Sequence, residues 1–231
     1  MDYLLEGLWQ AFALLFHGDP ETYSAVWVTV VVSSLSMACT LAIGAPLGFI
    51  LGYCRFPGRK AARLGVDTLL SLPTVVIGLM VYAFLSRRGP LGEMGLLFTI
   101  PGMAVGQTLL GLPIVMAMTA TAVENLDARL KNTLLTLGAG PMQIAATTLW
   151  EARFHLMLSA MAAYGRIVSE VGISMMVGGN IKWHTRTITT AIALETGKGE
   201  FAMGIALGLV LMIIALGVNF AAALLKRVTQ R

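Results

Sequence analysis

AVWVTVVVSSLSMACTLAIGAPLGFILGYC, residues Ala25–Cys54, is the stretch that decides the fold class of this chain. It contains no charged side chain, and it is longer than the roughly 20 residues that a helix needs to cross a bilayer. A helix of this length has to tilt, kink or protrude from the bilayer, and Pro46 is a candidate kink. The stretch therefore predicts a helix that spans a membrane.

The composition of the whole chain agrees with a membrane protein. Of its 231 residues, 57% are hydrophobic and 12% are charged, whereas soluble domains contain about 45–50% apolar and about 25% charged residues. A surface that faces lipid needs no charge. The net charge of +4 comes from basic residues in short loops between apolar runs, where such residues set membrane orientation. We therefore expect no nucleic-acid partner.

The sequence predicts an all-α integral membrane domain with five spans over residues 25–225. The spans are expected at about 25–54, 64–85, 96–123, 155–177 and 201–225. Residues 124–154 form a long loop, and residues 226–231 form a short tail. In the N-terminal segment, residues 1–24, apolar side chains share one helical face over residues 4–16. This pattern indicates either a helix that lies along the membrane or an extension of the first span.

Basic residues are distributed unequally between the two sides that these spans define. Ten lie on the side of the long loop, and five lie on the other side. Cytoplasmic loops carry the excess of Lys and Arg, so we expect a cytoplasmic C-terminus and an N-terminus outside. An odd number of spans agrees with this orientation. The ten are Arg55, Arg59, Lys60, Arg63, Arg129, Lys131, Arg153, Lys226, Arg227 and Arg231, and the five are Arg87, Arg88, Lys182, Arg186 and Lys198.

Glycines at four-residue spacing predict close contacts between helices. Gly44, Gly48 and Gly52 form two overlapping GxxxG steps in the first span, and Gly204 and Gly208 form another in the fifth. Small residues let helix backbones approach each other in a membrane, where no hydrophobic effect drives helix association. Both spans are therefore expected to pack closely against other helices.

Sequence patterns that carry enzyme chemistry are missing. There is no GxxxxGK[ST] phosphate loop, no HExxH, no CxxC and no GxSxG. His17, His155 and His184 are far apart in sequence and do not indicate a metal site. We therefore expect no enzyme, no metal and no cofactor in this chain. An ion-coupled transporter is the rival function, but it would show inverted repeats and more acidic residues at the midplane than Glu170 alone. A membrane-embedded enzyme would need a convergent set of catalytic groups, which the sequence does not show.

The long loop, residues 124–154, holds the most informative pattern. Leu130–Leu137 and Pro141–Leu149 are predicted to be short helices, separated by Gly138-Ala139-Gly140, with Pro141 in a first-turn position. Two short helices around a glycine hinge either dock a cytoplasmic partner or pack on the helices of their own chain. The residues alone favour neither alternative.

A resemblance to a known family begins in this loop. The segment Leu134–Gly172 resembles the coupling-loop signature of type I ABC importer permeases and reads LLTLGAGPMQIAATTLWEARFHLMLSAMAAYGRIVSEVG. In that family an EAA triplet precedes a glycine, and an apolar-x-Leu-Pro group follows. Gly138 matches the glycine, and Thr147-Thr148-Leu149 matches the residues before the proline. The chain departs from the signature at Asn132-Thr133-Leu134, where EAA is usual, and at Trp150, where proline is usual.

The resemblance covers about residues 25–225 and implies the fold of the type I, MetI-like, permeases of the bacterial inner membrane. It implies that two copies of the chain form the path between them. Two cytoplasmic ATPase subunits, which bind the ATP, would dock at residues 130–152, and an extracytoplasmic solute-binding protein would deliver the solute. The coupling residues implied by the resemblance are Asn132, Thr133, Leu134, Gly138, Ala139, Gly140, Leu149 and Trp150.

A second segment, Glu170–Phe201, looks like the tungstate-importer branch of these permeases, which is related to the molybdate and sulfate permeases. The residues that suggest this branch are GGNI, from Gly178, and TTAIALET, from Thr189. The resemblance implies a path for a tetrahedral oxyanion. Tungstate is the expected substrate, and molybdate, sulfate or another small solute is the alternative.

One ion pair is predicted inside a span. Arg166 and Glu170 are four residues apart and share a helical face with Ser169. Charges inside a membrane face the interior of a helix bundle or water. Arg166 would line the pathway and present positive charge to an oxyanion, or the pair would lock helices together. A neutralised pair attracts anions poorly, which favours the structural interpretation.

Further polar residues have more than one interpretation. Three polar residues, Ser71, Thr74 and Gln107, either line a pore or bond to neighbouring helices, and bonding is the commoner role of single hydroxyls and amides in a membrane. Lys182, His184 and Arg186 follow Gly178-Gly179-Asn180 on the outer side. These three attract an anion, contact a binding protein or are simply solvated.

Overall fold

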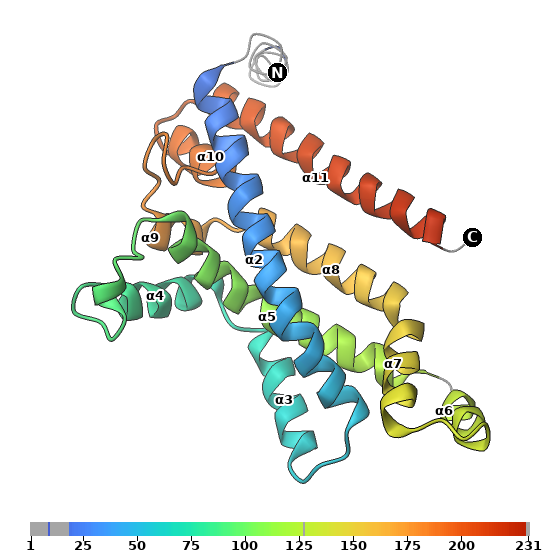
Figure 1. Ribbon diagram of the computed structural model, residues 1–231. Helices are drawn as coiled ribbons and strands as arrows, with labels where there is room; N and C mark the ends of the chain where they lie inside the picture. Colours follow the sequence, from blue (N-terminus) through green and yellow to red (C-terminus); the bar gives the residue numbers. More distant parts are fainter. Residues whose placement is uncertain (1–8, 10–18, 127, 230–231) are drawn as a thin grey trace.

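The computed structural model describes Trp9, residues 19–126 and residues 128–229. All regular secondary structure in this part of the chain is helical, which confirms the all-α prediction (Figure 1). The segment expected to form a helix over residues 4–16 lies, apart from Trp9, outside the described residues. In chain order the elements are α2 (Pro20–Tyr53), α3 (Arg59–Leu69), α4 (Thr74–Leu85), the 3₁₀ helix η1 (Gly92–Met94), α5 (Ile100–Glu124), α6 (Ala128–Thr136), α7 (Pro141–Glu151), α8 (Arg153–Val168), α9 (Gly172–Gly178), α10 (Ile188–Gly197) and α11 (Phe201–Thr229).

The first span is the long helix α2, which starts five residues before the predicted Ala25. Asp19 caps it, because its carboxylate accepts hydrogen bonds from the Thr22 backbone N–H at 2.8 Å and from the Thr22 hydroxyl at 2.6 Å. Pro20 follows in the first turn, where its missing N–H costs nothing. The helix continues through Pro46 to Tyr53.

The glycines of α2 bring it against α5, as the sequence predicts. A Cβ atom on Gly48 would lie 2.7 Å from the Met116 carbonyl oxygen, and one on Gly52 would lie 2.7 Å from the Ala120 carbonyl oxygen. The two backbones therefore approach too closely for any larger residue. The glycines of α11 behave differently, since a Cβ on Gly204 would lie 3.5 Å from the Thr196 hydroxyl oxygen, which is ordinary contact, and a Cβ on Gly208 would meet nothing within 4 Å. Among the described residues, the α11 motif therefore brings no backbone as close as the glycines of α2 do.

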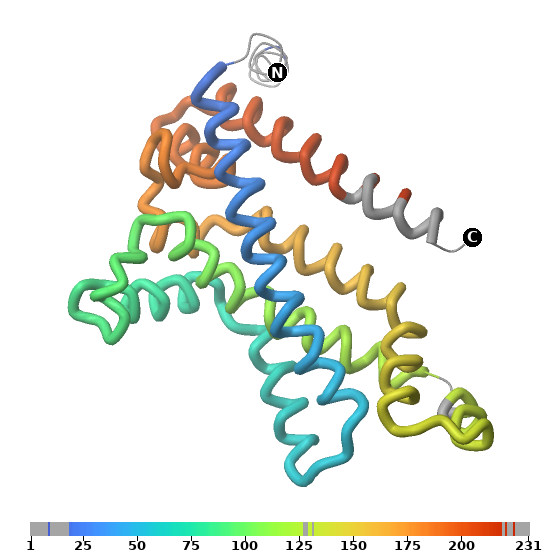
Figure 2. Tube along the Cα trace, in the orientation of Figure 1, coloured from blue at the N-terminus to red at the C-terminus, as the bar shows by residue number. Residues whose placement is uncertain are grey.

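Two of the five expected spans are pairs of helices with a bend between them. Over residues 64–85, α3 and α4 meet at 99°, and over residues 155–177, α8 and α9 meet at 59°. The α3–α4 bend is plain in Figure 2. Pro73 separates α3 from α4, because proline lacks a backbone N–H and disfavours helical backbone in the residue before it. Among the described residues, α2, α5 and α11 can each cross a membrane alone, and the count reaches five only if each bent pair is one span.

Helix α10, which was not predicted from the sequence, lies between the fourth and fifth expected spans. Thr187 caps this helix, since its hydroxyl accepts a hydrogen bond from the Thr190 N–H at 3.3 Å. The buried side chain of Ile188 packs in one cluster with Ala25 of α2 and Leu207 of α11. These contacts gather α10 and the starts of α2 and α11 at one end of the molecule, while α6 and α7 lie at the other (Figure 1).

Arg59 and Arg63, which the sequence analysis placed in a loop, lie in the first turns of α3. The Arg59 guanidinium donates to the Leu51 carbonyl at 2.7 Å and forms an ion pair with Glu124 at 2.5 Å. Arg63 donates to the Thr121 hydroxyl at 2.6 Å. These two arginines therefore tie α3 to the ends of α2 and α5.

Candidate functional site

The hairpin of α6 and α7 turns on Gly138, as the sequence predicts. Gly138 has a φ of +76°, which favours glycine, and it ends α6 in a Schellman motif. In this motif the Ala139 N–H donates to the Leu134 carbonyl at 2.9 Å, and the Gly138 N–H donates to the Leu135 carbonyl at 3.0 Å. Gly140 precedes α7, and its N–H donates to the Gln143 side chain at 2.8 Å. The glycine pair therefore sets the turn between the two helices.

The hairpin exposes large apolar side chains on both of its helices and in the turn between them. Other side chains of α7 are buried, namely Thr148 and Ile144, which is only 3% exposed. Asn132 and Thr133 are also exposed, while Leu134 is half-buried. Exposed large apolar side chains on this hairpin indicate a contact surface. Its exposed large apolar side chains are Leu135, Leu137, Met142, Leu149 and Trp150.

Arg166 and Glu170 form an ion pair with an N–O distance of 3.4 Å, but not on one helical face. The expectation of a shared face is wrong because α8 ends at Val168, so Glu170 lies in the break before α9. The Glu170 side chain is 2% exposed, and its carboxylate also accepts a hydrogen bond from the Ile173 N–H at 3.2 Å. Glu170 therefore holds the first turn of α9, which is a structural role.

The other two members of this predicted pathway group are accessible. The Arg166 side chain is 45% exposed, and Ser169 is exposed. The Ser169 hydroxyl donates to the Arg166 carbonyl at 3.1 Å, which leaves its lone pairs free to accept further bonds. Arg166 and Ser169 thus present a guanidinium and a hydroxyl on the exposed side of the α8–α9 bend.

Gln107 is buried and joins three helices. Its amide oxygen accepts a hydrogen bond from the Ser36 hydroxyl of α2 at 3.0 Å, and its amide nitrogen donates to the Ser174 hydroxyl of α9 at 3.2 Å. The side chain is 2% exposed. The structure therefore supports the interpretation in which Gln107 bonds to neighbouring helices.

At the other end of the molecule, Glu21 is the partner of two of the basic residues that the sequence predicts on the outer side. Its carboxylate forms ion pairs with Lys182 at 2.5 Å and with Arg186, and Arg186 also donates to the Asn180 side chain at 3.2 Å. The interpretation in which these two are simply solvated is therefore wrong. No sequence signal could have found this pairing, because Glu21 lies 165 positions from Arg186 and acidic residues are common at helix starts.

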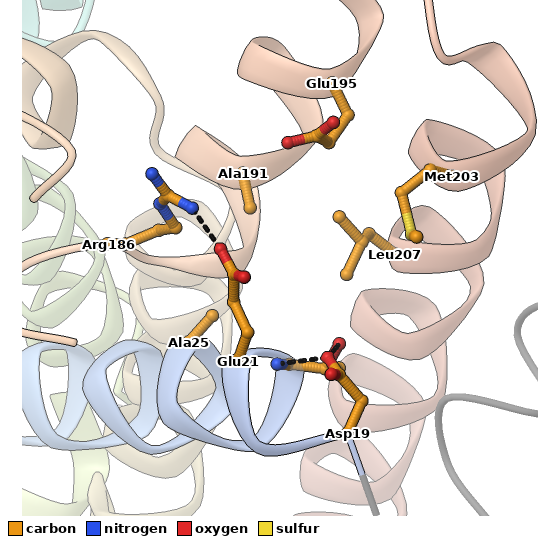
Figure 3. A pocket seen from close by; sticks show the side chains of 9 residues that line it. Asp19, Glu21, Ala25, Arg186, Ala191, Glu195, Met203 and Leu207 are labelled. Atoms are coloured by element: carbon orange, nitrogen blue, oxygen red, sulfur yellow. Dashed lines mark hydrogen bonds and ion pairs between the residues drawn. The ribbon is translucent and has the colours of Figure 1, made fainter. Parts of the chain in front are cut away.

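A cavity of about 250 Å³ lies beside this ion pair, between α2, α10 and α11. Figure 3 shows Arg186 and Glu21 facing each other, with Glu195 of α10 nearby and Met203 and Leu207 of α11 on the far side. The three acidic side chains that line the cavity all have partners. Asp19 caps α2, Glu21 pairs with Lys182 and Arg186, and Glu195 pairs with Lys198 at 2.8 Å. Over residues 19–126 and 128–229, no three His, Cys, Asp or Glu side chains are placed to hold a metal ion.

Comparison with known proteins places the whole chain in one group. Residues 44–231 match the family described as "Binding-protein-dependent transport system inner membrane component". The tungstate uptake system permease protein TupB of Campylobacter jejuni is 50% identical over 227 residues, which are 98% of this chain and 95% of the relative. TupB of Peptoclostridium acidaminophilum is 39% identical, over 95% of this chain and 96% of the relative. The molybdenum transport system permease protein ModB of Escherichia coli K12 is 30% identical, over 79% and 83%.

Solved structures have the same fold at low identity. An inward-facing structure of the MetNI methionine ABC transporter has a TM-score of 0.76 and 22% identity, over 91% of this chain and 97% of that one. A bacterial ABC transporter that imports alginate has a TM-score of 0.77 and 19% identity, over 96% and 84%. From its sequence, its helical architecture and these relatives, the chain belongs to the family of binding-protein-dependent transport system inner membrane components, the permease subunits of ABC transporters.

Proposed function

We propose that this chain is the permease subunit of an ABC importer and that it forms the path for tungstate through the inner membrane. The observation that carries the substrate is the 50% identity to a tungstate uptake permease over 98% of this chain. Identity spread over the full length includes every helix that could line the path. The permeases named for molybdenum are more distant, at 30% identity.

In the assembly that we propose, two copies of the chain enclose the path. Each copy contributes a transmembrane domain of five spans over residues 25–225, with each bent pair counted as one span. The N-terminus lies outside, and residues 226–231 form a cytoplasmic tail. The distribution of basic residues supports this orientation. A reporter fused after Arg231 should be active only as a cytoplasmic marker, and an active periplasmic phosphatase at that position would contradict the orientation.

The hairpin of α6 and α7 is the proposed docking element for the ATPase subunits. Its exposed apolar side chains, including Leu137 at 76% and Met142 at 83%, support this role because they would be buried by a partner. Asn132, Thr133 and Leu134 on α6, the hinge at Gly138-Ala139-Gly140, and Leu149 and Trp150 on α7 belong to the same element. ATP-driven closure of two ATPase subunits would move this hairpin and open the permease toward the solute-binding protein outside.

The exposed side of the α8–α9 bend is the proposed place where the anion passes. Arg166 offers positive charge and Ser169 offers a hydroxyl, while Glu170 keeps the bend in place and partly neutralises Arg166. A weakly attractive site suits transport, because a solute that is to be released must not be held tightly. Most of the specificity is then expected in the solute-binding protein.

The experiment is reconstitution of the chain with its genomic neighbours in liposomes. The ATPase subunits should copurify with the chain, and uptake of tungstate should require ATP together with the loaded binding protein. Competition by molybdate and sulfate ranks the substrates, and stronger uptake of either would reassign the solute. If no ATPase copurifies and uptake follows an ion gradient, the chain is a secondary transporter and the proposal is wrong.

A further inference from the structure

A single residue joins α7 to α8. Ala152 is 0% exposed and has helical backbone angles, with φ −73° and ψ −8°. Its N–H donates to the Thr148 carbonyl at 3.0 Å, and its carbonyl accepts from the Leu156 N–H at 3.0 Å. Figure 1 shows α7 turning away from the line of α8 at this point. The angle between the two helices is therefore set at one tight junction without a linker.

The guanidinium of Arg153 lies over two aromatic rings at this junction. Its guanidinium carbon is 4.6 Å from the centre of the Trp150 ring and 4.4 Å from the centre of the Phe154 ring. One guanidinium nitrogen also donates to the Trp150 carbonyl at 2.7 Å. A cation at the C-terminal end of α7 is favourable because it complements the partial negative charge there. The planar guanidinium can stack on aromatic faces, which an ammonium group cannot do.

The contacts between the Arg153 guanidinium and the aromatic rings orient both the guanidinium and the Trp150 ring. Trp150 is 66% exposed, so the core does not fix its ring. The Nε atom of Arg153 is buried and has no hydrogen-bond partner among the described residues. The two ring contacts and the bond to the Trp150 carbonyl therefore orient the guanidinium. Trp150 also occupies the position at which the coupling-loop signature usually has proline.

The length of α8 makes the stiffness of this junction important. Arg166 lies about 20 Å along α8 from Arg153, at 1.5 Å per residue. A change of ten degrees at the junction would displace that end of α8 by roughly 3 Å over this length. A loose junction would absorb a movement of α7 before the movement reached the α8–α9 bend.

We propose that Trp150, Arg153 and Phe154 form a rigid elbow that transmits the movement of α7 to α8. Arg153 is a positioning residue, because it acts through the angle at Ala152 and touches no solute. The inference rests on the proposed function, since it requires that α7 docks an ATPase subunit. It adds that transmission depends on Arg153 and Phe154, which are not among the exposed apolar side chains proposed to dock the ATPase, while Trp150 belongs to both groups.

The test uses the full complex, reconstituted with its ATPase subunits and binding protein. Arg153→Gln and Trp150→Ala remove the stack, whereas Trp150→Phe keeps a ring in place. The measurement is the number of solute molecules carried per ATP hydrolysed, together with the amount of ATPase subunit that copurifies. Met142→Ala is the matched control, because this residue is exposed on α7 but lies at the opposite end from Ala152.

In Arg153→Gln, copurification should be unchanged, and transport per ATP should fall about tenfold, as expected for the loss of two cation–π contacts. In Trp150→Ala, transport per ATP should fall about threefold, and in Trp150→Phe it should be close to that of the parent. In the double variant with Arg153→Gln and Trp150→Ala, transport per ATP should be no lower than in Arg153→Gln alone. Met142→Ala, which removes a proposed docking side chain and leaves the three elbow residues in place, should reduce copurification, whereas Arg153→Gln should not.

Unchanged transport per ATP in Arg153→Gln, or additive losses in the double variant, would overturn the elbow. Loss of copurification in Arg153→Gln would assign the residue to docking and would also overturn it. If the parent chain itself copurifies with no ATPase, the proposed function has failed, which is a different outcome.

Discussion

Replacing Gly48 by alanine tests how α2 and α5 are held together. The added Cβ would lie 2.7 Å from the Met116 carbonyl oxygen, about 0.7 Å inside the 3.4 Å at which ordinary contact begins. It would also lie 2.9 Å from the Met116 Cα. Because these obstacles are backbone atoms and cannot rotate away, the two helices have to separate. Overpacking of this kind costs about 1–3 kcal/mol, and the rigid backbone contact places Gly48→Ala near the upper end.

The matched control is Gly208→Ala in α11, where the added Cβ meets nothing within 4 Å. Alanine favours a helix over glycine by about 1 kcal/mol at both positions, so the difference between the two variants isolates the contact with α5. We expect Gly48→Ala to be less stable than Gly208→Ala by about 2–3 kcal/mol. For a chain of this size the difference corresponds to roughly 5–10 °C in melting temperature.

The assay is thermal unfolding of the detergent-purified chain, followed by size-exclusion chromatography of the protein that remains folded. Gly52→Ala should behave like Gly48→Ala, because its Cβ would lie 2.7 Å from the Ala120 carbonyl oxygen. The double variant should lose less than the sum, since one separation of the helices relieves both contacts. Equal melting temperatures for Gly48→Ala and Gly208→Ala would refute a close contact of α2 with α5.

Further variants test the candidate site. Gly138→Val places a β-branched residue at φ +76°, so binding-protein-stimulated ATP hydrolysis should collapse while the chain inserts normally; unchanged stimulation in a confirmed variant would count against the hairpin as coupling element. Glu170→Ala leaves the buried Ile173 N–H without a partner and should lower unfolding stability by about 1–3 kcal/mol in the same thermal assay. Arg166→Gln should be milder in stability and should reduce uptake, and normal uptake would remove Arg166 from the pathway. Gln107→Leu should cost about 0.6–1.7 kcal/mol, and an unchanged melting temperature would mean that its bonds contribute nothing.

The features that depend only on neighbouring residues could be predicted from the sequence. Uncharged runs predicted the membrane-spanning class and the helices α2, α5 and α11, because the cost of placing charge in lipid is a property of each segment alone. The hinge at Gly138 was predictable for the same reason, since glycine is the residue that most readily takes a positive φ. The glycines of α2 predicted a close contact with another helix, but they did not predict that this helix is α5.

Tertiary structure alone decided the features that depend on distant residues. The helix α10 and the pairing of Glu21 with Arg186 depend on contacts across the fold, and hydropathy reports neither of them. The shared face expected for Arg166 and Glu170 failed because α8 ends between them. Gln107 likewise joined α2 and α9 only when the chain had folded. A pattern read along a helix shows which side chains share a face, but only packing shows which of those faces meet.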